Sequence, residues 1–421
     1  MKKMFLALLC AIPAMVCYGQ IVEKKIDSSK GKVIELNTVM VTGKASTDPV
    51  LSKVKTDLVK KVVQPKNVAD LFSNINAFTL IKRGNYAIDP SFRASQYEQL
   101  NIQFDGGTKA MHACPNRMDP ITTHVVPEDI EKIEIIKGPY TMRYGSTFAG
   151  IVNLVTQTPQ SMQMGLHGSV SSGYESNGGA SVSSIKLQQV TDAYDITANA
   201  GYRDFGNYKD GAGTVIPSSF RSLDYGLKVG YNISDTQRVQ AHWRQSYGRD
   251  VLHAGLPMDT EEDNSSILSL DYKINGLKGL IKEVNAKAYY SYVDHIMSNE
   301  GRPSFAKMEA VTPVQSNTYG GKMEFAFTPS EKLLIYTGAD ADVIARAGDK
   351  NVTMKSDMMG NPIDMPMTMV TSVWQDAVIQ DYGVFAEGSY KINKVLTATA
   401  GARVDYVSSL IKSPDQNFLD L

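Results

Sequence analysis

From residue 160 onward, the chain consists of segments of about ten to fifteen residues in which polar and apolar side chains alternate. Successive side chains of a β-strand point to opposite faces, so this alternation predicts strands with one polar and one apolar face. The eleven expected strands lie at residues 162–173, 181–191, 193–203, 221–232, 236–247, 266–275, 282–297, 315–328, 332–346, 373–391 and 395–408.

The connections between these strands alternate in length. Short turns at 191–193, 234–236, 329–331 and 392–394 alternate with long loops at 204–219, 248–264, 298–314 and 347–372. Short turns on one side and long loops on the other are typical of an outer-membrane β-barrel. A soluble β-sandwich is the alternative, but it does not sort its loops in this way. We therefore expect a transmembrane antiparallel β-barrel.

The N-terminus agrees with export. Lys2 and Lys3 precede an apolar run at Met4–Val16, and small or polar residues follow it. This order is that of a cleaved secretory signal peptide, which we assign to residues 1–19. No other long apolar segment occurs, and the net charge of −1 gives no reason to expect nucleic-acid binding.

The number of expected strands bears on completeness. Eleven is an odd number, whereas bacterial single-chain barrels have even numbers of strands, and Asn417–Leu421 has the character of a loop. We therefore expect a truncated sequence that holds about half of a larger barrel. An open sheet leaves unpaired edges in lipid, so we expect the 421-residue chain alone not to form a functional membrane protein.

Two regions precede the strands. Residues 20–52 are polar and lysine-rich, as in a flexible leader, but contain a β-prone run of Thr38, Val39, Met40, Val41 and Thr42. This run suits either pairing with the sheet edge of another protein or the first strand of the next domain. Residues 53–157 have mixed α+β character. We expect a helix at 67–75 and strands at Leu100–Phe104, Ile130–Ile136 and Ile151–Thr156.

The stretch from Ala110 to Thr123 contains several sulfur and nitrogen side chains that can bind metals. Cys114 and Met118 lie four residues apart, and Met111 and His112 precede them. Cys114 is the only cysteine outside the signal peptide, and an odd cysteine is unusual in an exported protein. A thiol with thioethers and an imidazole favours Cu(I). The alternative is a buried loop in which these side chains only fill space.

The long loop at 347–372 is rich in methionine. Six thioethers fall within sixteen residues, at Met354, Met358, Met359, Met365, Met367 and Met369. A polar loop outside the membrane has no core for them to fill, so weak, exchanging copper sites are one interpretation. A hydrophobic loop cluster or a surface for a partner is the other. We expect His112, His124, His253 and Met258 to be structural.

A longer pattern connects these parts. Ile130–Pro139, IEKIEIIKGP, is followed by Arg143–Ser146, RYGS, by Ala149–Asn153, AGIVN, and by Val155-Thr156. This pattern resembles the plug-domain signature of TonB-dependent outer-membrane receptors. The resemblance implies a plug at 53–157 inside a barrel of roughly twenty-two strands, with residues 160–421 as its N-terminal half. It also implies that Thr38–Thr42 is the TonB box, which the energising protein TonB captures by strand addition.

Within that family, Cys114–Pro120, CPNRMDP, is similar to the motif of the TonB-dependent copper receptors. In those proteins a plug Cys and a Met four residues later share a copper ion with a His-x-Met pair on the barrel. This chain has a matching pair at His295 and Met297. The resemblance therefore implies a copper site of Cys114, Met118, His295 and Met297, with Cu(I) favoured and Cu(II) as a second form.

The alternation in the expected strand 282–297 agrees with that assignment. Its even positions are mostly apolar and suit lipid, whereas its odd positions are mostly polar and suit the lumen. His295 and Met297 therefore point inward. We expect this seventh strand to end at the outer mouth, over the plug, and Asp294 or Asp119 to orient the imidazole.

Together these features predict a TonB-dependent receptor of the Gram-negative outer membrane that imports copper ions. Copper would bind between plug and barrel and leave when TonB pulls on the plug. The expected partners are TonB with its inner-membrane energising complex, outer-membrane lipid, and copper or a copper chelate. The alternatives are a siderophore or cobalamin receptor of the same family and a surface copper-binding protein without transport. The sequence has no recognisable catalytic motif, so no enzymatic activity is expected.

Overall fold

The computed structural model describes residues 51–55, 64–137, 141–145, 147–157, 164–357 and 359–414. These residues lie within one compact unit, Asp48–Leu421. The predicted signal peptide, the predicted TonB box and Met358 lie outside the described residues. No helix in the described part of the chain is long and apolar enough to cross a membrane.

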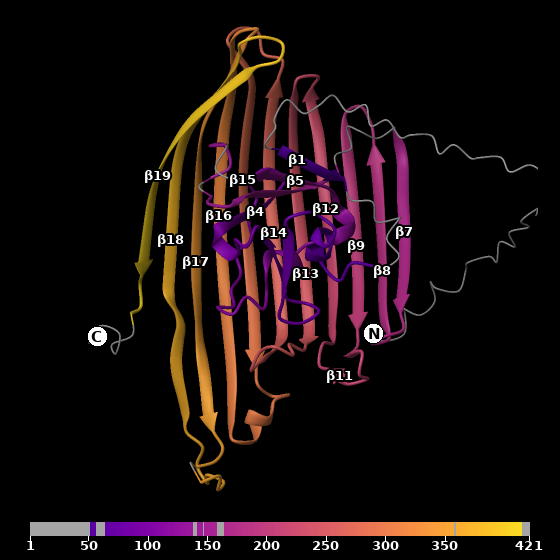
Figure 1. Ribbon diagram of the computed structural model, residues 1–421, viewed down its shortest axis with the longest axis vertical. Coiled ribbons are helices and arrows are strands. Elements are labelled where there is room, and N and C mark those ends of the chain that lie inside the picture. The colour runs from indigo at the N-terminus through magenta and orange to yellow at the C-terminus, as the bar shows by residue number, and fades with distance from the viewer. Residues whose placement is uncertain are drawn as a thin grey trace, which may run out of the picture. The chain divides into compact units, whose positions relative to one another are not determined.

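Eleven antiparallel strands form one continuous sheet, the barrel sheet, in which consecutive strands are neighbours (Figure 1). The strands are β7 (Gly165–Glu175), β8 (Ala180–Val190), β9 (Tyr194–Phe205), β12 (Phe220–Ser234), β13 (Gln237–Val251), β14 (Asp259–Asn275), β15 (Ile281–Ser298), β16 (Met308–Ser330), β17 (Leu333–Met354), β18 (Thr368–Lys391) and β19 (Thr397–Ile411). Their number and order confirm the prediction.

Burial along these strands is the reverse of that in a soluble protein. In β12, the apolar side chains of Leu223 and Leu227 are exposed on one face, whereas Asp224 and Lys228 are buried on the other. Apolar side chains that face outward suit hydrocarbon, and polar side chains that face inward suit a hydrated lumen. The sheet is therefore the wall of a transmembrane barrel, as predicted.

The strands extend further into the long connections than predicted. β16 begins at Met308 rather than at residue 315, and β17 continues to Met354 rather than ending at residue 346. Other connections contain the short strands β10 (Tyr208–Lys209) and β11 (Val215–Ile216) and the 3-10 helix η7 (Pro303–Ala306). The alternation of polar and apolar side chains underestimates the length of these strands. Strand segments outside the lipid need no apolar face, although their main chains remain paired.

A smaller domain at residues 51–157, the N-terminal domain, contains a four-stranded sheet in the order β1-β5-β6-β4. Its strands are β1 (Leu51–Lys55), β4 (Leu100–Phe104), β5 (Ile130–Lys137) and β6 (Gly150–Thr156), beside a hairpin of β2 (Phe78–Lys82) and β3 (Ile88–Phe92). The structure confirms the predicted strands β4, β5 and β6. The sequence analysis missed β1, β2 and β3, and β1 begins inside the range expected for the leader.

The helix expected at 67–75 is wrong in type and length. The structure has a 3-10 helix, η2 (Val68–Phe72), whose N-cap is Asn67, and the Asn67 side chain accepts a hydrogen bond from the N–H of Ala69. The chain leaves η2 at Ser73, and the positive φ of Ala77, 73°, leads directly into β2. The other helices in the described part of this domain are single 3-10 turns, η3 (Tyr97–Gln99), η4 (Ile121–Thr123) and η5 (Pro127–Asp129).

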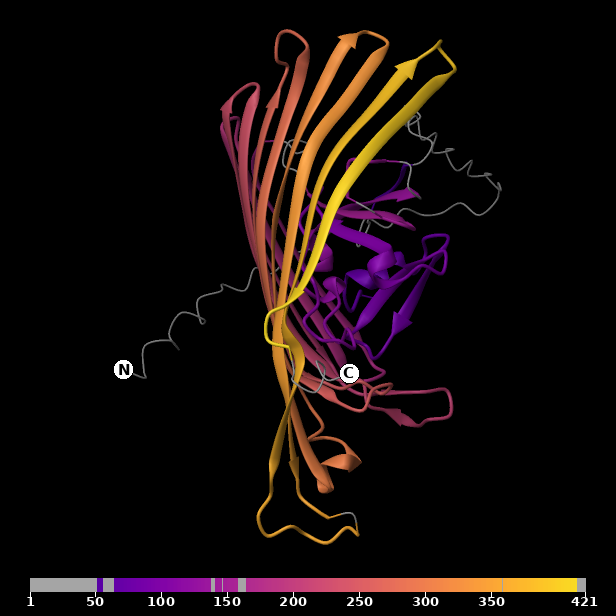
Figure 2. The same cartoon turned by 90° about the vertical axis from the view of Figure 1, so that its left-hand side faces the viewer.

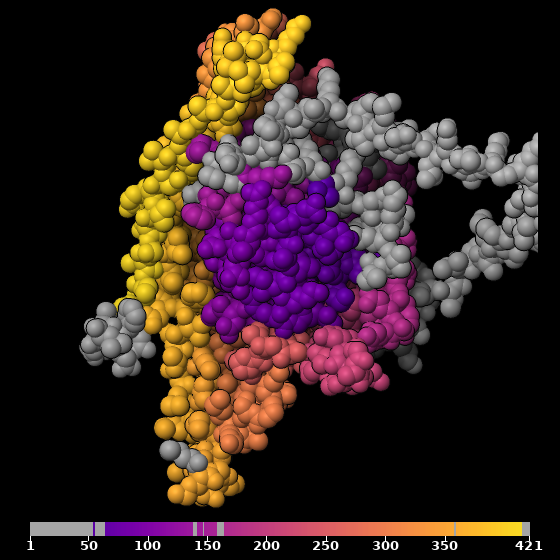
Figure 3. Space-filling view, in the orientation of Figure 1, coloured from indigo at the N-terminus to yellow at the C-terminus, as the bar shows by residue number. Residues whose placement is uncertain are grey.

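The N-terminal domain lies on the inner, concave face of the barrel sheet (Figures 2 and 3). Its apolar core, built around Phe72, Phe104 and Ile133, also contains Ile267 of β14. Charged pairs add to the contact: the Arg143 guanidinium donates two hydrogen bonds, of 2.9 and 2.6 Å, to the Glu324 carboxylate of β16. Apolar packing and paired charges together hold the domain against the sheet.

Candidate metal centre

Asp119 folds the loop that carries Cys114. Its carboxylate accepts hydrogen bonds from the backbone N–H groups of Ala113, at 2.6 Å, and Cys114, at 3.1 Å. The N–H of Arg117 donates to the carbonyl of Cys114 at 2.9 Å, and Arg117 has a positive φ of 53°. These bonds turn the chain back, so that residues four apart face the same side. The Asp119 carboxylate therefore shapes the loop. The prediction that Asp119 orients the His295 imidazole is not supported by these bonds.

Two barrel side chains hold the same loop from the other side. The indole Nε1–H of Trp374 in β18 donates to the carbonyl of Ala113 at 2.6 Å. The Nε–H of Arg346 in β17 donates to the carbonyl of His112 at 2.9 Å. The loop main chain is thus fixed relative to the barrel sheet, and the sequence analysis identified neither residue.

The structure brings the four predicted copper ligands together. The Sγ atom of Cys114 lies 3.7 Å from the Sδ atom of Met297, and the His295 imidazole lies near the Cys114 side chain. The buried cluster at this point contains Ala113, Cys114, Met118, Val293, Met297 and Val314. Cys114 and His295 are 0% exposed, Met118 is 1% exposed and Met297 is 3% exposed, so the group is closed to bulk solvent. The inward direction predicted for His295 and Met297 is confirmed.

Asp263, the cross-strand partner of His295, lies beside its ring. The Nδ1 atom of His295 is 3.4 Å from a carboxylate oxygen of Asp263, and the other oxygen accepts a hydrogen bond of 2.7 Å from the Tyr86 hydroxyl. The Nε2 atom lies 3.5 Å from the Thr260 hydroxyl. Asp294 was the wrong choice, because adjacent residues of a strand face opposite sides and Asp294 points away from the lumen.

Burial controls the charges beside Cys114. Burial raises the pKa of Asp119, the charge of Asp263 adds to this shift, and His295 opposes it. Burial and the charge of Arg117 lower the pKa of His112 from 6.5 to about 2, so this imidazole is neutral. His112 accepts a hydrogen bond of 3.1 Å from Arg117 and lies outside the sulfur cluster.

The methionine-rich segment lies on a different surface. Met354 ends β17 and Met369 lies in β18, while Met359 and Met365 are 91% and 86% exposed in the connection between these strands. Met367 is also exposed. Met359, Met365, Met367 and Met369 are thus exposed, whereas Met354 is partly buried.

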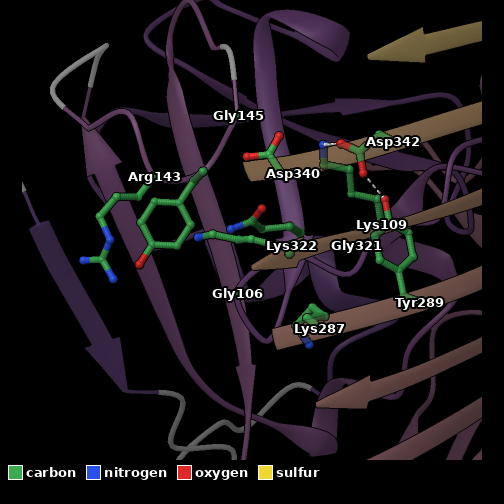
Figure 4. A pocket seen from close by; sticks show the side chains of 13 residues that line it. Gly106, Lys109, Arg143, Gly145, Lys287, Tyr289, Gly321, Lys322, Asp340 and Asp342 are labelled. Carbon is green, nitrogen blue, oxygen red and sulfur yellow. Dashed lines mark hydrogen bonds and ion pairs between the residues drawn. The ribbon is translucent and has the colours of Figure 1, made fainter. Parts of the chain in front are cut away.

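Another polar contact region between the N-terminal domain and the barrel contains none of the predicted ligands (Figure 4). Lys109 forms an ion pair with Asp342 of β17, which also accepts a hydrogen bond from Tyr289. An adjoining cavity of about 410 Å³ is lined by seven lysine and arginine side chains and four acidic ones. This positive lining disfavours a bare metal cation in the cavity.

Two family models match the chain over most of its length. The TonB-dependent Receptor Plug Domain matches residues 44–152, and the TonB dependent receptor-like β-barrel matches residues 182–419. The chain belongs to the TonB-dependent receptor family. Members of this family are outer-membrane β-barrel transporters and receptors rather than enzymes, so the predicted class is confirmed. The N-terminal domain is the plug.

This TonB-dependent receptor resembles two curated relatives. The Rhizobactin receptor of Rhizobium meliloti (strain 1021) is 21% identical over 320 residues, which is 67% of this chain and 43% of the relative. The Hemin receptor of Yersinia enterocolitica is 22% identical over 321 residues, which is 70% of this chain and 44% of the relative. The matched region thus spans less than half the length of either relative.

Solved structures share the fold of this receptor. The copper transporter OprC superposes with a TM-score of 0.74 at 24% identity, covering 86% of this chain and 55% of that one. The FrpB iron transporter from Neisseria meningitidis gives a TM-score of 0.66 at 14% identity, covering 86% of this chain and 61% of that one. These likenesses establish the architecture. The two solved proteins are named for different metals, copper and iron.

Proposed function

We propose that this receptor imports copper across the outer membrane and binds the ion between plug and barrel. The observation that carries the proposal is the 3.7 Å contact between Cys114 of the plug and Met297 of the barrel, in a buried group with Met118 and His295. The likeness to a copper transporter of the same fold is consistent with it. The residues 1–19, 20–52, 53–157 and 160–421 serve as signal peptide, leader with TonB box, plug and barrel segment in this proposal.

The chemistry of the group favours copper over iron. One thiolate, two thioethers and one imidazole form a soft ligand set, which suits Cu(I), and Cu(II) is accommodated by the thiolate and the imidazole. Iron in siderophores is held by the chelate itself and needs no protein sulfur. The site excludes bulk solvent, so no water competes for the ion once it is bound.

Release follows from the division of the ligands between two parts of the protein. Cys114 and Met118 belong to the plug, and His295 and Met297 belong to β15. In this proposal TonB, driven by its inner-membrane complex, captures Thr38–Thr42 and pulls on the plug, which separates the two pairs of ligands. The exposed methionines after β17 collect copper from the medium and pass it inward by exchange between weak sites.

Copper affinity tests the proposal. The substitution Cys114→Ala is introduced into the native gene, and the outer-membrane protein is purified and titrated with Cu(I) against a competing chelator. Cys114→Ala and Met118→Leu weaken binding by at least about 100-fold, because each removes a direct ligand. Met258→Leu is the matched control, since Met258 packs against the same cluster without being a proposed ligand, and it leaves binding unchanged.

A parent protein that binds no copper, or a Cys114→Ala protein that binds it as tightly as the parent, overturns the proposal. Uptake of a metal chelate is the second candidate, favoured by the curated relatives that are named as receptors for rhizobactin and hemin. Purified receptor that retains an iron chelate or heme, and not copper, supports that candidate. Copper binding without TonB-dependent uptake into cells indicates a surface copper-binding protein instead.

A further inference from the structure

A second group of metal-ligating side chains is buried beside the sulfur cluster. Asp119 and His124 of the plug and Asp263 of β14 each offer one ligand atom, and these atoms lie within 4.8 Å of one another. Atoms that share one ion at about 2.1 Å lie roughly 3–4 Å apart, so a small closure brings the three into coordination. None of the three is among the four proposed copper ligands.

The ring of His124 is arranged as in a metal-binding histidine. Its Nε2 atom lies 3.2 Å from the carbonyl oxygen of Asp119, to which an Nε2–H donates. Its Nδ1 atom is buried and has no hydrogen-bond partner among the described residues. Histidines that bind metals commonly donate one ring N–H to a carbonyl, which leaves the lone pair of the other nitrogen for the ion. An unpaired nitrogen at a buried position is otherwise unfavourable.

The charges at this point also favour a cation. Asp119 and Asp263 are both fully buried, and within the described part of the chain neither forms an ion pair with a lysine or arginine. Asp119 accepts bonds from backbone N–H groups, and Asp263 has Tyr86 and His295 as neighbours. The one basic side chain paired with either carboxylate among the described residues is His295, beside Asp263. Two neighbouring buried carboxylates that share so little positive charge are costly, and a bound metal ion lowers that cost.

We propose that Asp119, His124 and Asp263 bind a second metal ion that joins the plug to the barrel. Two carboxylate oxygens and one imidazole nitrogen suit a divalent ion of the zinc class rather than Cu(I). This site therefore favours a different metal ion from the sulfur cluster. Two of its ligands belong to the plug and one to the barrel wall. The ion therefore fastens the plug in its resting position, and displacement of the plug breaks the site.

Zinc binding by the full-length native protein with Cys114→Ser tests this proposal, because that background removes the thiolate of the copper group. After treatment with a chelator, the protein is dialysed against micromolar Zn²⁺ and its metal content is measured. We expect one zinc ion per chain and a higher unfolding temperature with zinc than without it. Adding His124→Gln raises the Kd for zinc at least tenfold.

His112→Gln is the matched control, because His112 is also a buried plug histidine but is paired with Arg117 and lies outside the group. It leaves zinc binding unchanged. A Cys114→Ser protein that binds no zinc overturns the proposal. Equal zinc affinity in that protein before and after His124→Gln is added also overturns it. Neither result depends on copper binding, so this proposal and the copper proposal fail separately.

Discussion

The Sγ atom of Cys114 and the Sδ atom of Met297 lie 3.7 Å apart, although the two residues are separated by 183 positions in the sequence. The contact depends on the fold of the plug loop, on its anchoring to β17 and β18, and on the inward face of β15. Changes in any of these three are therefore expected to change copper affinity even where no ligand is altered.

Asp263 and Asp294 provide a matched pair of carboxylates around His295. Asp263→Asn removes the charge beside Nδ1 and weakens the orientation of the ring, so we expect copper affinity to fall about 10- to 100-fold. Asp294→Asn lies on the opposite face of β15 and leaves the affinity within about twofold of the parent. Competition titrations of both proteins with Cu(I) measure the difference, and equal losses would refute the proposed role of Asp263.

Trp374 anchors the Cys114 loop through one hydrogen bond. Trp374→Phe keeps an aromatic ring but leaves the buried carbonyl of Ala113 without its indole donor, which destabilises the closed loop by about 1–3 kcal/mol. Amide hydrogen exchange at residues 113–118 then becomes faster. The chain has only one other tryptophan, Trp243, which is partly exposed on the outer face of β13, and Trp243→Phe leaves this exchange unchanged. Unaltered exchange in Trp374→Phe contradicts the anchoring role.

His253, in the connection between β13 and β14, predicts a loss of local stability in acid. Burial lowers its pKa from 6.5 to about 3, and the neighbouring His295 and Arg302 act in the same direction. The unfolded loop takes up a proton near pH 6.5, whereas the folded loop does so only near pH 3. The stabilising contribution is therefore complete above pH 6.5 and decreases as the pH falls toward 3, by about 2 kcal/mol at pH 5.

The measurement is amide exchange of residues 252–258 at pH 7.5 and pH 5, corrected for the chemical exchange rate. The parent protein opens more at pH 5, and His253→Gln removes most of that difference. His167→Gln in β7 changes a histidine outside this connection and is the control. A parent protein with the same opening free energy at both pH values is incompatible with a neutral, buried His253.

The exposed methionines predict a kinetic effect. Replacing Met359, Met365, Met367 and Met369 by Leu removes four thioethers and keeps their apolar volume, so the Kd of the buried site stays within about twofold. Copper uptake by cells at low external copper slows several-fold, because fewer weak sites collect the ion. Met164→Leu with Met323→Leu replaces two other exposed methionines and is the control. Equal uptake by all three strains favours the partner-surface interpretation of these residues.

The alternation of side chains predicted the eleven strands and the inward direction of His295 and Met297, because the membrane imposes the pattern on each strand separately. Turn signals predicted β4 to β6 in the plug. The hairpin β2–β3 was missed because its strands show no clear alternation of polar and apolar side chains. β3 contains Pro90, and Ala77, which has a positive φ, directly precedes β2. The short η2 was expected to be an α-helix because apolar spacing does not distinguish one 3-10 turn from a longer helix.

The surroundings of the candidate metal centre were less predictable than the direction in which its candidate ligands on β15 point. Asp263 lies opposite His295 through the register of β14 and β15, which cannot be read from either strand alone. Trp374 and Arg346 reach the plug loop from strands whose position over Cys114 depends on the curvature of the whole sheet. His124 looked structural because its partners are distant in sequence or depend on how the loop folds. Each of these contacts depends on tertiary placement, which local sequence patterns do not encode.

The complete burial of Cys114 has a chemical consequence for an exported protein. A thiol in an oxidising compartment is normally lost to disulfide formation or to sulfenic acid, and both reactions require a partner or an oxidant to reach the sulfur. Here Cys114 is 0% exposed between the plug loop and the barrel wall, which restricts the access of another thiol or of peroxide. If Cys114 binds Cu(I) as proposed, its burial keeps the sulfur in the reduced form that this ion requires.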